Sequence, residues 1–171
     1  ATVAVTITPA PIAGVSTSLS SCVNSAAQDL FLLLGPTAQI GGTWTPALAS
    51  GTGFYDPALD PPGIYTYTVI GTPPCVNATA TVTITLIPPP NAGSNGSLTI
   101  CSTAPSQDLF GSLGGTPQSG GTWTPALASG TGIFNPLLDP AGIYTYTATG
   151  TPPCSNATAT VTVTATATAT A

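Results

Sequence analysis

The chain has 171 residues and a net charge of −5, because five Asp are its only charged side chains and Lys, Arg, His and Met are absent. Phosphate and anionic lipid are bound largely by Lys and Arg, so nucleic acid is a very poor partner and attachment to lipid by charge is not expected. Without His, no Ser-His-Asp or Cys-His set can form, so we expect no enzyme activity and no cofactor. No apolar run reaches the roughly 20 residues that span a bilayer.

An internal repeat with a period of 79 residues organises the sequence. Residues 41–53 recur letter for letter at 120–132, and a fixed period of this size indicates an array of domains. We therefore expect an overhanging strand at 1–9, a first repeat at 10–87, a second repeat at 88–168 and a tail at 169–171.

The overhang has two candidate origins. It is either the last strand of a preceding repeat or a strand that completes the sheet of a neighbouring molecule. Proline-rich runs at 9–11 and 88–90 mark the boundaries of the first repeat. Such runs resist helix and central strand, so they predict semi-rigid linkers between domains.

Alternation of Thr with aliphatic or aromatic residues predicts strands in both repeats. It is clearest at 63–69, 80–86 and 142–149, where the period of two is that of a half-buried strand. Asp29 and Asp108 each precede an apolar segment and are expected to cap it. Short strands separated by Gly and Pro turns, with one Trp between two cysteines, predict an all-β fold of two tandem Ig-like β-sandwich domains.

The four cysteines fall as one pair in each repeat. We expect intradomain disulfides between Cys22 and Cys75 and between Cys101 and Cys154, each stabilising its domain by about 4 kcal/mol in the chain-entropy model. The alternative pairing, Cys75 with Cys101, would join neighbouring domains. Neither CxxC nor His is present, so the cysteines indicate disulfides in an oxidising, extracellular location and no metal site.

Trp44 and Trp123 are the candidate binding aromatics. Each lies in the sequence Gly-Gly-Thr-Trp-Thr-Pro. An exposed Trp can stack on a sugar ring, whereas a Trp between paired cysteines is a known core residue of Ig-like domains. We favour the core interpretation and keep carbohydrate binding as the alternative.

Asp56, Asp60 and Asp139 are weak candidates for calcium ligands, because Ca²⁺ is held by carboxylate and carbonyl oxygens. Each of the three is followed by Pro, and Asp-Pro commonly opens a turn in which the Asp side chain caps its own backbone. The favoured interpretation is therefore a turn. Asn135 occupies the position of Asp56 in the second repeat, which removes the carboxylate pair there.

Three short motifs match the acceptor sequence for Asn glycosylation. They would matter only in a host that has the glycosylation machinery. The candidate sites are Asn77, Asn95 and Asn156.

The phrases Gly-Gly-Thr-Trp-Thr-Pro, Gly-Ile-Tyr-Thr-Tyr-Thr and Gly-Thr-Pro-Pro-Cys-x-Asn-Ala-Thr occur in this order in both repeats. Their order resembles tandem repeats of giant cell-surface proteins of Bacteroidota, including gliding-associated adhesins exported by type 9 secretion. The resemblance implies extracellular placement, Ig-like sandwiches in series and an adhesive or filamentous role. It transfers no functional residue.

These observations predict a structural repeat segment of an extracellular filament, stalk or surface adhesin. Such a segment acts as a mechanical spacer, and low surface charge favours self-association through β-strand edges. The expected partners are copies of the chain itself. The alternative is a carbohydrate- or surface-binding adhesion module, with glycans or a surface as the partner.

Overall fold

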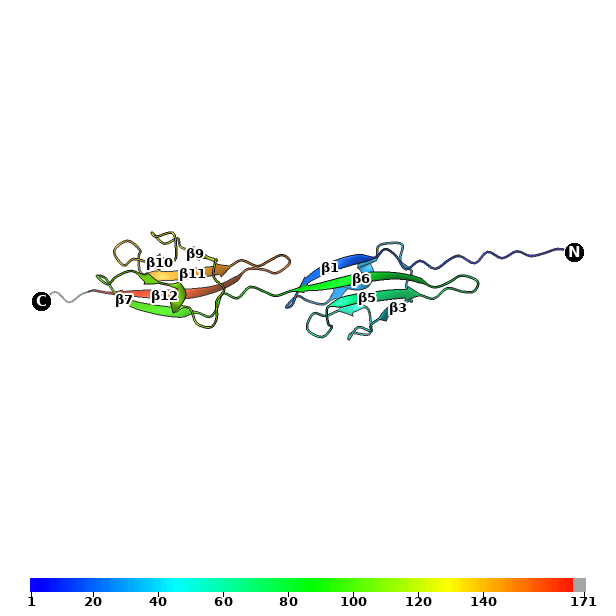
Figure 1. Cartoon of the computed structure of the whole chain (residues 1–171), viewed down its shortest axis with the longest axis horizontal. Helices are drawn as coiled ribbons and strands as arrows, with labels where there is room; N and C mark the ends of the chain where they lie inside the picture. Colours follow the sequence, from blue (N-terminus) through cyan, green and yellow to red (C-terminus); the bar gives the residue numbers. More distant parts are fainter. Residues whose placement is uncertain (168–171) are drawn as a thin grey trace. The chain divides into compact units, whose positions relative to one another are not determined.

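The computed structural model describes residues 1–167. The chain divides into two compact units, Ala1–Pro88 and Pro89–Ala171, and the division falls inside the proline run at 88–90 (Figure 1). The expected tail at 169–171, with residue 168, lies outside the described residues.

Unit 1 contains a four-stranded sheet and a two-stranded sheet. In the larger sheet, β1 pairs in parallel with β6, while β5 pairs antiparallel with both β6 and β3. The smaller sheet pairs β2 with β4, and a short helix, α1, follows β2 directly. The bounds are β1 (Thr17–Cys22), β2 (Gln28–Asp29), α1 (Leu30–Leu33), β3 (Thr43–Thr45), β4 (Phe54–Tyr55), β5 (Gly63–Val69) and β6 (Ala78–Ile87).

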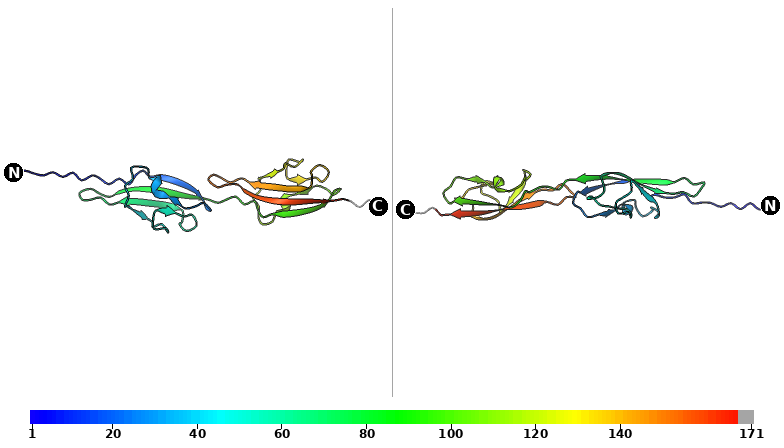
Figure 2. Two further views of the ribbon diagram at one scale, coloured as in Figure 1. Left: turned by 180° about the vertical axis from the view of Figure 1, so that it is seen from behind. Right: turned by 90° about the horizontal axis from the view of Figure 1, so that it is seen from below.

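Unit 2 repeats this topology, and Figure 2 shows each unit from two further sides. Its larger sheet has the order β7-β12-β11-β9, with β7 parallel to β12, and its smaller sheet pairs β8 with β10. A 3-10 helix, η1, takes the place of α1. The bounds are β7 (Gly96–Cys101), β8 (Gln107–Asp108), η1 (Phe110–Ser112), β9 (Thr122–Thr124), β10 (Ile133–Phe134), β11 (Gly142–Ala148) and β12 (Ala157–Thr166).

The core of each unit lies between its two sheets. In unit 1 the alternating residues Tyr65 and Tyr67 of β5 and Val82 and Ile84 of β6 face Tyr55 of β4, and all five are buried. The intervening Thr residues point to the other face, as the period of a strand requires. The predicted strands are thus confirmed, and their alternating residues face the core and the solvent in turn.

A tyrosine hydrogen bond near the start of β5 recurs near the start of β11 and supports the Ig-like fold. The Tyr65 hydroxyl donates to the carbonyl of Pro61 at 2.8 Å, and in unit 2 Tyr144 donates to Pro140 at 2.7 Å. A Tyr near the start of a strand that bonds to the backbone a few residues upstream resembles the tyrosine corner of Ig-like domains, although here Tyr67 and Tyr146 stand where that motif has a Cys. The all-β fold with two tandem Ig-like β-sandwiches is therefore confirmed.

The predicted intradomain disulfides are wrong. Cys22 lies opposite Ile87 at the last residue of β6, whereas Cys75 precedes the first residue of the same strand, Ala78. Ten residues of strand separate them by about 30 Å, and a disulfide requires Cα atoms within about 7 Å. Cys75 is a free thiol, so its alternative pairing with Cys101 is absent as well.

The same argument applies in unit 2. Cys101 is in register with Thr166 at the end of β12, and Cys154 precedes the start of that strand at Ala157. Cys22 and Cys154 are the disulfide-bonded cysteines among the described residues. The prediction of disulfide bonding is therefore correct for Cys22 and Cys154 and wrong for Cys75. The predicted pairing is wrong because it depends on which end of the sheet each cysteine occupies.

The overhang at 1–9 has no strand partner within the described chain. Val3 and Val5 are 87% and 84% exposed, although the residues that match them in the repeat, Val82 and Ile84, are 0% and 3% exposed. The overhang thus has the same side-chain alternation as β6, the last strand of unit 1, but it pairs with no strand within residues 1–167. None of the helices within residues 1–167 has the length and apolar character that a membrane crossing requires.

Candidate functional site

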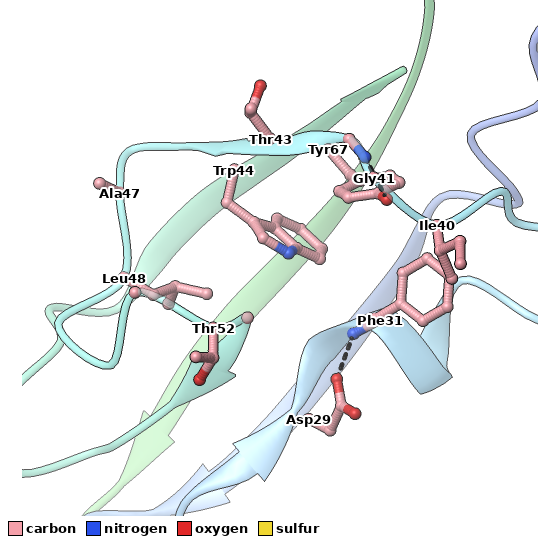
Figure 3. Close-up of a pocket in the computed structure, with 13 residues that line it drawn as sticks. Asp29, Phe31, Ile40, Gly41, Thr43, Trp44, Ala47, Leu48, Thr52 and Tyr67 are labelled. Atoms are coloured by element: carbon pink, nitrogen blue, oxygen red, sulfur yellow. Dashed lines mark hydrogen bonds between the residues drawn. The ribbon is translucent and has the colours of Figure 1, made fainter.

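An aromatic hollow lies beside β3 in unit 1 (Figure 3) and has a volume of about 430 Å³. Trp44 of β3, Phe31 of α1 and Tyr67 of β5 line it, together with the carboxylate of Asp29. An equivalent hollow of about 510 Å³ is present in unit 2. It is lined by Asp108, Phe110, Trp123 and Tyr146, among others.

Tyr67 holds the three rings of the hollow in place. Trp44 is its cross-strand partner, with ring centroids 5.0 Å apart, and Phe31 contacts it edge-to-face at 5.5 Å. The Tyr67 hydroxyl donates to the carbonyl of Gln39 and accepts from the amide of Gly42, both at 2.8 Å. The ring and its hydroxyl are therefore fixed, so the hollow is preformed.

Asp29 shapes the hollow by starting the helix. Its Oδ1 accepts a hydrogen bond from the amide of Phe31 at 2.9 Å, which makes Asp29 the N-cap of α1. Asp108 makes the equivalent bond to the amide of Phe110 at 2.9 Å. The predicted capping role is confirmed for Asp29, whereas the N-cap of η1 is Leu109 and Asp108 binds the first amide of that helix. In both units the bond places the Phe ring at the hollow.

Gly53 allows the indole to lie close to the backbone. Its φ of +88° is one that residues with a side chain rarely adopt, and an added Cβ would lie 3.2 Å from Nε1 of Trp44. At Gly132 the corresponding atom would lie 2.9 Å from Nε1 of Trp123. In each unit the second Gly of Gly-Thr-Gly thus allows the Trp indole to pack directly against the backbone.

Trp44 and Trp123 lie between the core and the surface of their units. Each is half-buried and packs against its core, and each also lines its hollow. Neither occupies the centre of the sandwich, which in unit 1 is filled by Tyr55 and Tyr65. The centre is unavailable to Trp44 because β3 is an edge strand.

The rims of the two hollows differ at one position. Ile40 is exposed at the rim in unit 1, and Ser119 takes its place in unit 2. One hollow therefore presents an apolar rim and the other a hydroxyl. The sequence reasoning missed the Phe and Tyr residues of the site, although the Gln-Asp-Leu-Phe motif occurs in both repeats and marks the Phe.

The calcium candidates act as turn caps. Asp60 is buried, and its two carboxylate oxygens accept the amides of Ala49 at 2.8 Å and Asp56 at 2.9 Å. The Oδ1 atom of Asp56 accepts the amide of Ala58 at 2.9 Å. The predicted turn role is confirmed. Within residues 1–167, no three His, Cys, Asp or Glu side chains gather as they would around a metal ion.

The second repeat builds the same turn with one amide in place of a carboxylate. Asp139 accepts the amides of Ala128 at 2.7 Å and Asn135 at 2.8 Å. Asn135 in turn accepts the amide of Leu137 at 3.0 Å, as Asp56 does for Ala58.

The three candidate glycosylation sites are exposed Asn residues. In each, the side-chain Oδ1 accepts a backbone amide, at 2.9 to 3.0 Å. Asn77 and Asn156 close the turn before the last strand, and Asn95 bonds to that strand at Thr160. These bonds give the Asn side chains a structural role in the turns.

No protein-family model and no curated protein matches this chain. Among solved structures, the structure of mouse clustered PcdhgC3 EC1-3 is similar to it with a TM-score of 0.27 and 16% sequence identity. That likeness covers 70% of this chain and 50% of the other. This chain thus matches half of the length of that structure.

Proposed function

We propose that the chain is a structural repeat segment of an extracellular filament, stalk or surface adhesin, in which each sandwich is a mechanical spacer. The observation that carries this proposal is that one closed sandwich is built twice. Each unit has its own core, its own tyrosine corner and its own buried Asp cap. Repetition of a complete unit is what an array requires, because each repeat is then stable where it stands.

Cysteine chemistry supports the extracellular location. Disulfides persist in oxidising compartments, and Cys22 and Cys154 are disulfide-bonded. The resemblance of the repeat phrases to cell-surface repeats of Bacteroidota supports the same location. The proposal assigns no catalytic activity to the chain.

The second part of the proposal is that the chain self-associates through the edge strands of its sheets. β1 is the longer edge strand of the large sheet in unit 1, and β7 is its equivalent in unit 2. Edge strands are usually protected by charged residues, especially Lys, which the chain lacks. The outward residues of these edges are exposed Ser and Thr, which do not oppose pairing with another copy.

Sedimentation velocity and negative-stain images of the full chain over a range of concentrations test self-association. We expect assemblies that grow with concentration, and their loss when Lys is placed on both edges. The edge variant is Ser18→Lys, Ser20→Lys, Ser97→Lys and Thr99→Lys.

The matched control places the same four charges on exposed positions of the central strands β6 and β12. It should assemble as the unchanged chain does, because those strands already have two neighbours. Monomers at every concentration of the unchanged chain would contradict self-association. The control substitutions are Thr83→Lys, Thr85→Lys, Thr162→Lys and Thr164→Lys.

Carbohydrate binding at the aromatic hollow is the second candidate function. It is favoured by a preformed concave site in each unit, with aromatic rings and a carboxylate on its walls. Apolar surface with a few polar groups is typical of small-molecule sites. A glycan array should show binding that is lost in Trp44→Ala with Trp123→Ala and kept in the matching Trp→Phe pair. A chain that binds no glycan on the array would remove this candidate.

A further inference from the structure

The cysteines occupy two positions at opposite ends of each sheet. We call the exit position the place beside the last residue of the final strand, held by Cys22 beside Ile87 and by Cys101 beside Thr166. The entry position is the turn that precedes the final strand, held by Cys75 and Cys154.

Both positions take disulfides in this chain. Cys22, at an exit position, and Cys154, at an entry position, are disulfide-bonded. Cys75 holds the other entry position and is a free thiol. Its turn is built like that of Cys154, because the two cysteine amides donate to Thr72 and Thr151 respectively, both at 2.9 Å.

The Cys75 thiol lies next to the place that the exit cysteine of another repeat would take. Its Sγ donates to the carbonyl oxygen of Thr8 at 3.4 Å. Thr8 matches Ile87 in the 79-residue repeat, and Ile87 is the register partner of Cys22. A strand that paired with residues 1–8 as β1 pairs with β6 would therefore place its exit cysteine beside Thr8 and so beside Cys75.

Residues 1–8 have the surface that such a strand and its core would cover. Val3 and Val5 are exposed, whereas Val82 and Ile84 at the matching positions are buried beneath a complete sandwich. Covering both side chains again would remove their apolar surface from water, which favours pairing. The apolar face and the thiol thus indicate the same partner.

We propose that Cys75 forms a disulfide with the exit-position cysteine of another copy of the repeat, the copy whose first strand pairs with residues 1–8 as β1 pairs with β6. The two thiols form one S–S bond and lose two protons and two electrons. A small-molecule disulfide such as oxidised glutathione accepts them and becomes two thiols. Each such bond ties the end of one sandwich to the start of the next.

This inference rests on the proposed function only in requiring copies of the repeat in series. It does not require edge association or glycan binding. A chain that stays dispersed and binds no glycan, but in which Cys75 bonds to an exit cysteine, would refute the proposed lateral assembly and keep the disulfide.

The experiment has two arms that distinguish the source of the partner. In the first, the 171-residue chain is equilibrated in a glutathione redox buffer and alkylated. It is then digested with pepsin without reduction, because trypsin has no site, and mapped by mass spectrometry. In the second, residues 10–79 are joined ahead of Ala1, which matches Ala80, so that the chain begins with one more complete repeat. The added copy carries Asn24→Gln as a mass label.

We expect the Cys75 peptide linked to an exit-cysteine peptide. A link in the first arm identifies a separate molecule as the source and should give disulfide-linked multimers that reductant dissolves. A link in the second arm alone identifies a preceding repeat of one polypeptide. Changing the added copy's exit cysteine with Cys22→Ser should leave Cys75 free to alkylate.

Three results overturn the proposal. They are a Cys75 that is alkylated in both arms, a Cys75 capped by glutathione in both arms, and a Cys75 bonded to any cysteine outside the exit position. The readout is the chemical state of one thiol, so it does not depend on how well a substituted chain folds.

Discussion

Tyr55 carries a buried hydroxyl that the matching residue of the second repeat, Phe134, lacks. Its hydroxyl is the one buried side-chain oxygen or nitrogen within residues 1–167 that lacks a hydrogen-bond partner. The second repeat has Phe134 at the matching position, equally buried in the same core. A buried hydroxyl without a partner loses its hydrogen bonds to water and gains none in return.

We therefore expect Tyr55→Phe to raise the free energy of unfolding of unit 1 by about 1 kcal/mol. Chemical denaturation followed by hydrogen exchange at the peptides of unit 1 measures the change. The reciprocal substitution, Phe134→Tyr, is the control and should lower the stability of unit 2. A Tyr55→Phe chain that is less stable than the original would show that an ordered water satisfies the hydroxyl.

Alkaline pH should destabilise the fold through buried tyrosines. Burial, with a smaller contribution from the charge of Asp60, raises the pKa of Tyr55 and of Tyr65 above the ordinary value of 10.0. Burial beside Asp139 raises the pKa of Tyr144 in the same way. Above pH 10 the unfolded chain loses these protons while the folded chain keeps them, so ionisation favours unfolding.

The free energy of unfolding should therefore show no contribution from these groups below about pH 9 and should fall as the pH rises past 10. Denaturation curves at pH 7, 9, 10 and 11, with thiols alkylated beforehand, measure the fall. It should be smaller in Tyr55→Phe, which removes one of the groups. Equal stability at pH 7 and pH 11 would contradict the assignment of these tyrosines as buried and neutral.

The turn before β5 is held by one carboxylate, that of Asp60, which accepts hydrogen bonds from two backbone amides. Asp60 accepts two amides with its two oxygens, whereas Asp56 accepts one amide with a single oxygen. Asn can replace Asp56, as Asn135 does in unit 2, because one acceptor oxygen is enough there. Asn cannot replace Asp60, because its NH₂ group would face a second backbone donor.

We expect Asp60→Asn to lower the stability of unit 1 by about 2 kcal/mol and Asp56→Asn to change it by less than about 0.5 kcal/mol. Thermal or chemical unfolding of the two variants side by side measures both values. The pair is matched in charge, so a general effect of net charge cancels. Equal destabilisation by both substitutions would mean that the charge, and not the number of acceptor oxygens, holds the turn.

Local sequence patterns predicted the long strands and the turns. They did not predict which strands pair when those strands are far apart in the chain. The Tyr-Thr alternation at β5 and the Asp caps are properties of a few neighbouring residues, so the sequence was sufficient for both. The parallel register of β1 on β6 joins residues far apart in the chain, and no local pattern indicates it. That register alone puts Cys22 and Cys75 at opposite ends of the sheet, and so the predicted pairing was wrong.

The sequence indicated some residues of the aromatic hollow but not that they meet, for a related reason. Trp44 is conspicuous in the sequence, and Phe31 lies in the motif Gln-Asp-Leu-Phe, but nothing local indicates that both contact Tyr67. Their meeting depends on β3 taking an edge of the sheet and α1 following the small sheet. The role of Gly53 beneath the indole likewise appears only when the fold is known.

At the scale of the whole molecule, the chain holds two cores with no residue in common. Every member of one hydrophobic cluster belongs to unit 1, and every member of the other belongs to unit 2. The chain also lacks Lys, Arg and His, so charge pairs between side chains cannot contribute to either unit. Apart from the disulfide bonding of Cys22 and Cys154, stability must therefore come from apolar burial and hydrogen bonds within each sandwich.

Separate cores predict that damage to one unit leaves the other intact. Val82 and Val161 hold matching, fully buried positions in β6 and β12, so each Val→Ala substitution should cost about 2 kcal/mol in its own unit. Hydrogen exchange by mass spectrometry, resolved by peptide, should show faster exchange only in the unit that carries the change. The double variant should show the sum of the two effects, because sites without shared partners are additive. Faster exchange in the unchanged unit, or a double variant that departs from the sum, would mean that the sandwiches fold as one body and would remove the basis for describing each repeat as an independent spacer.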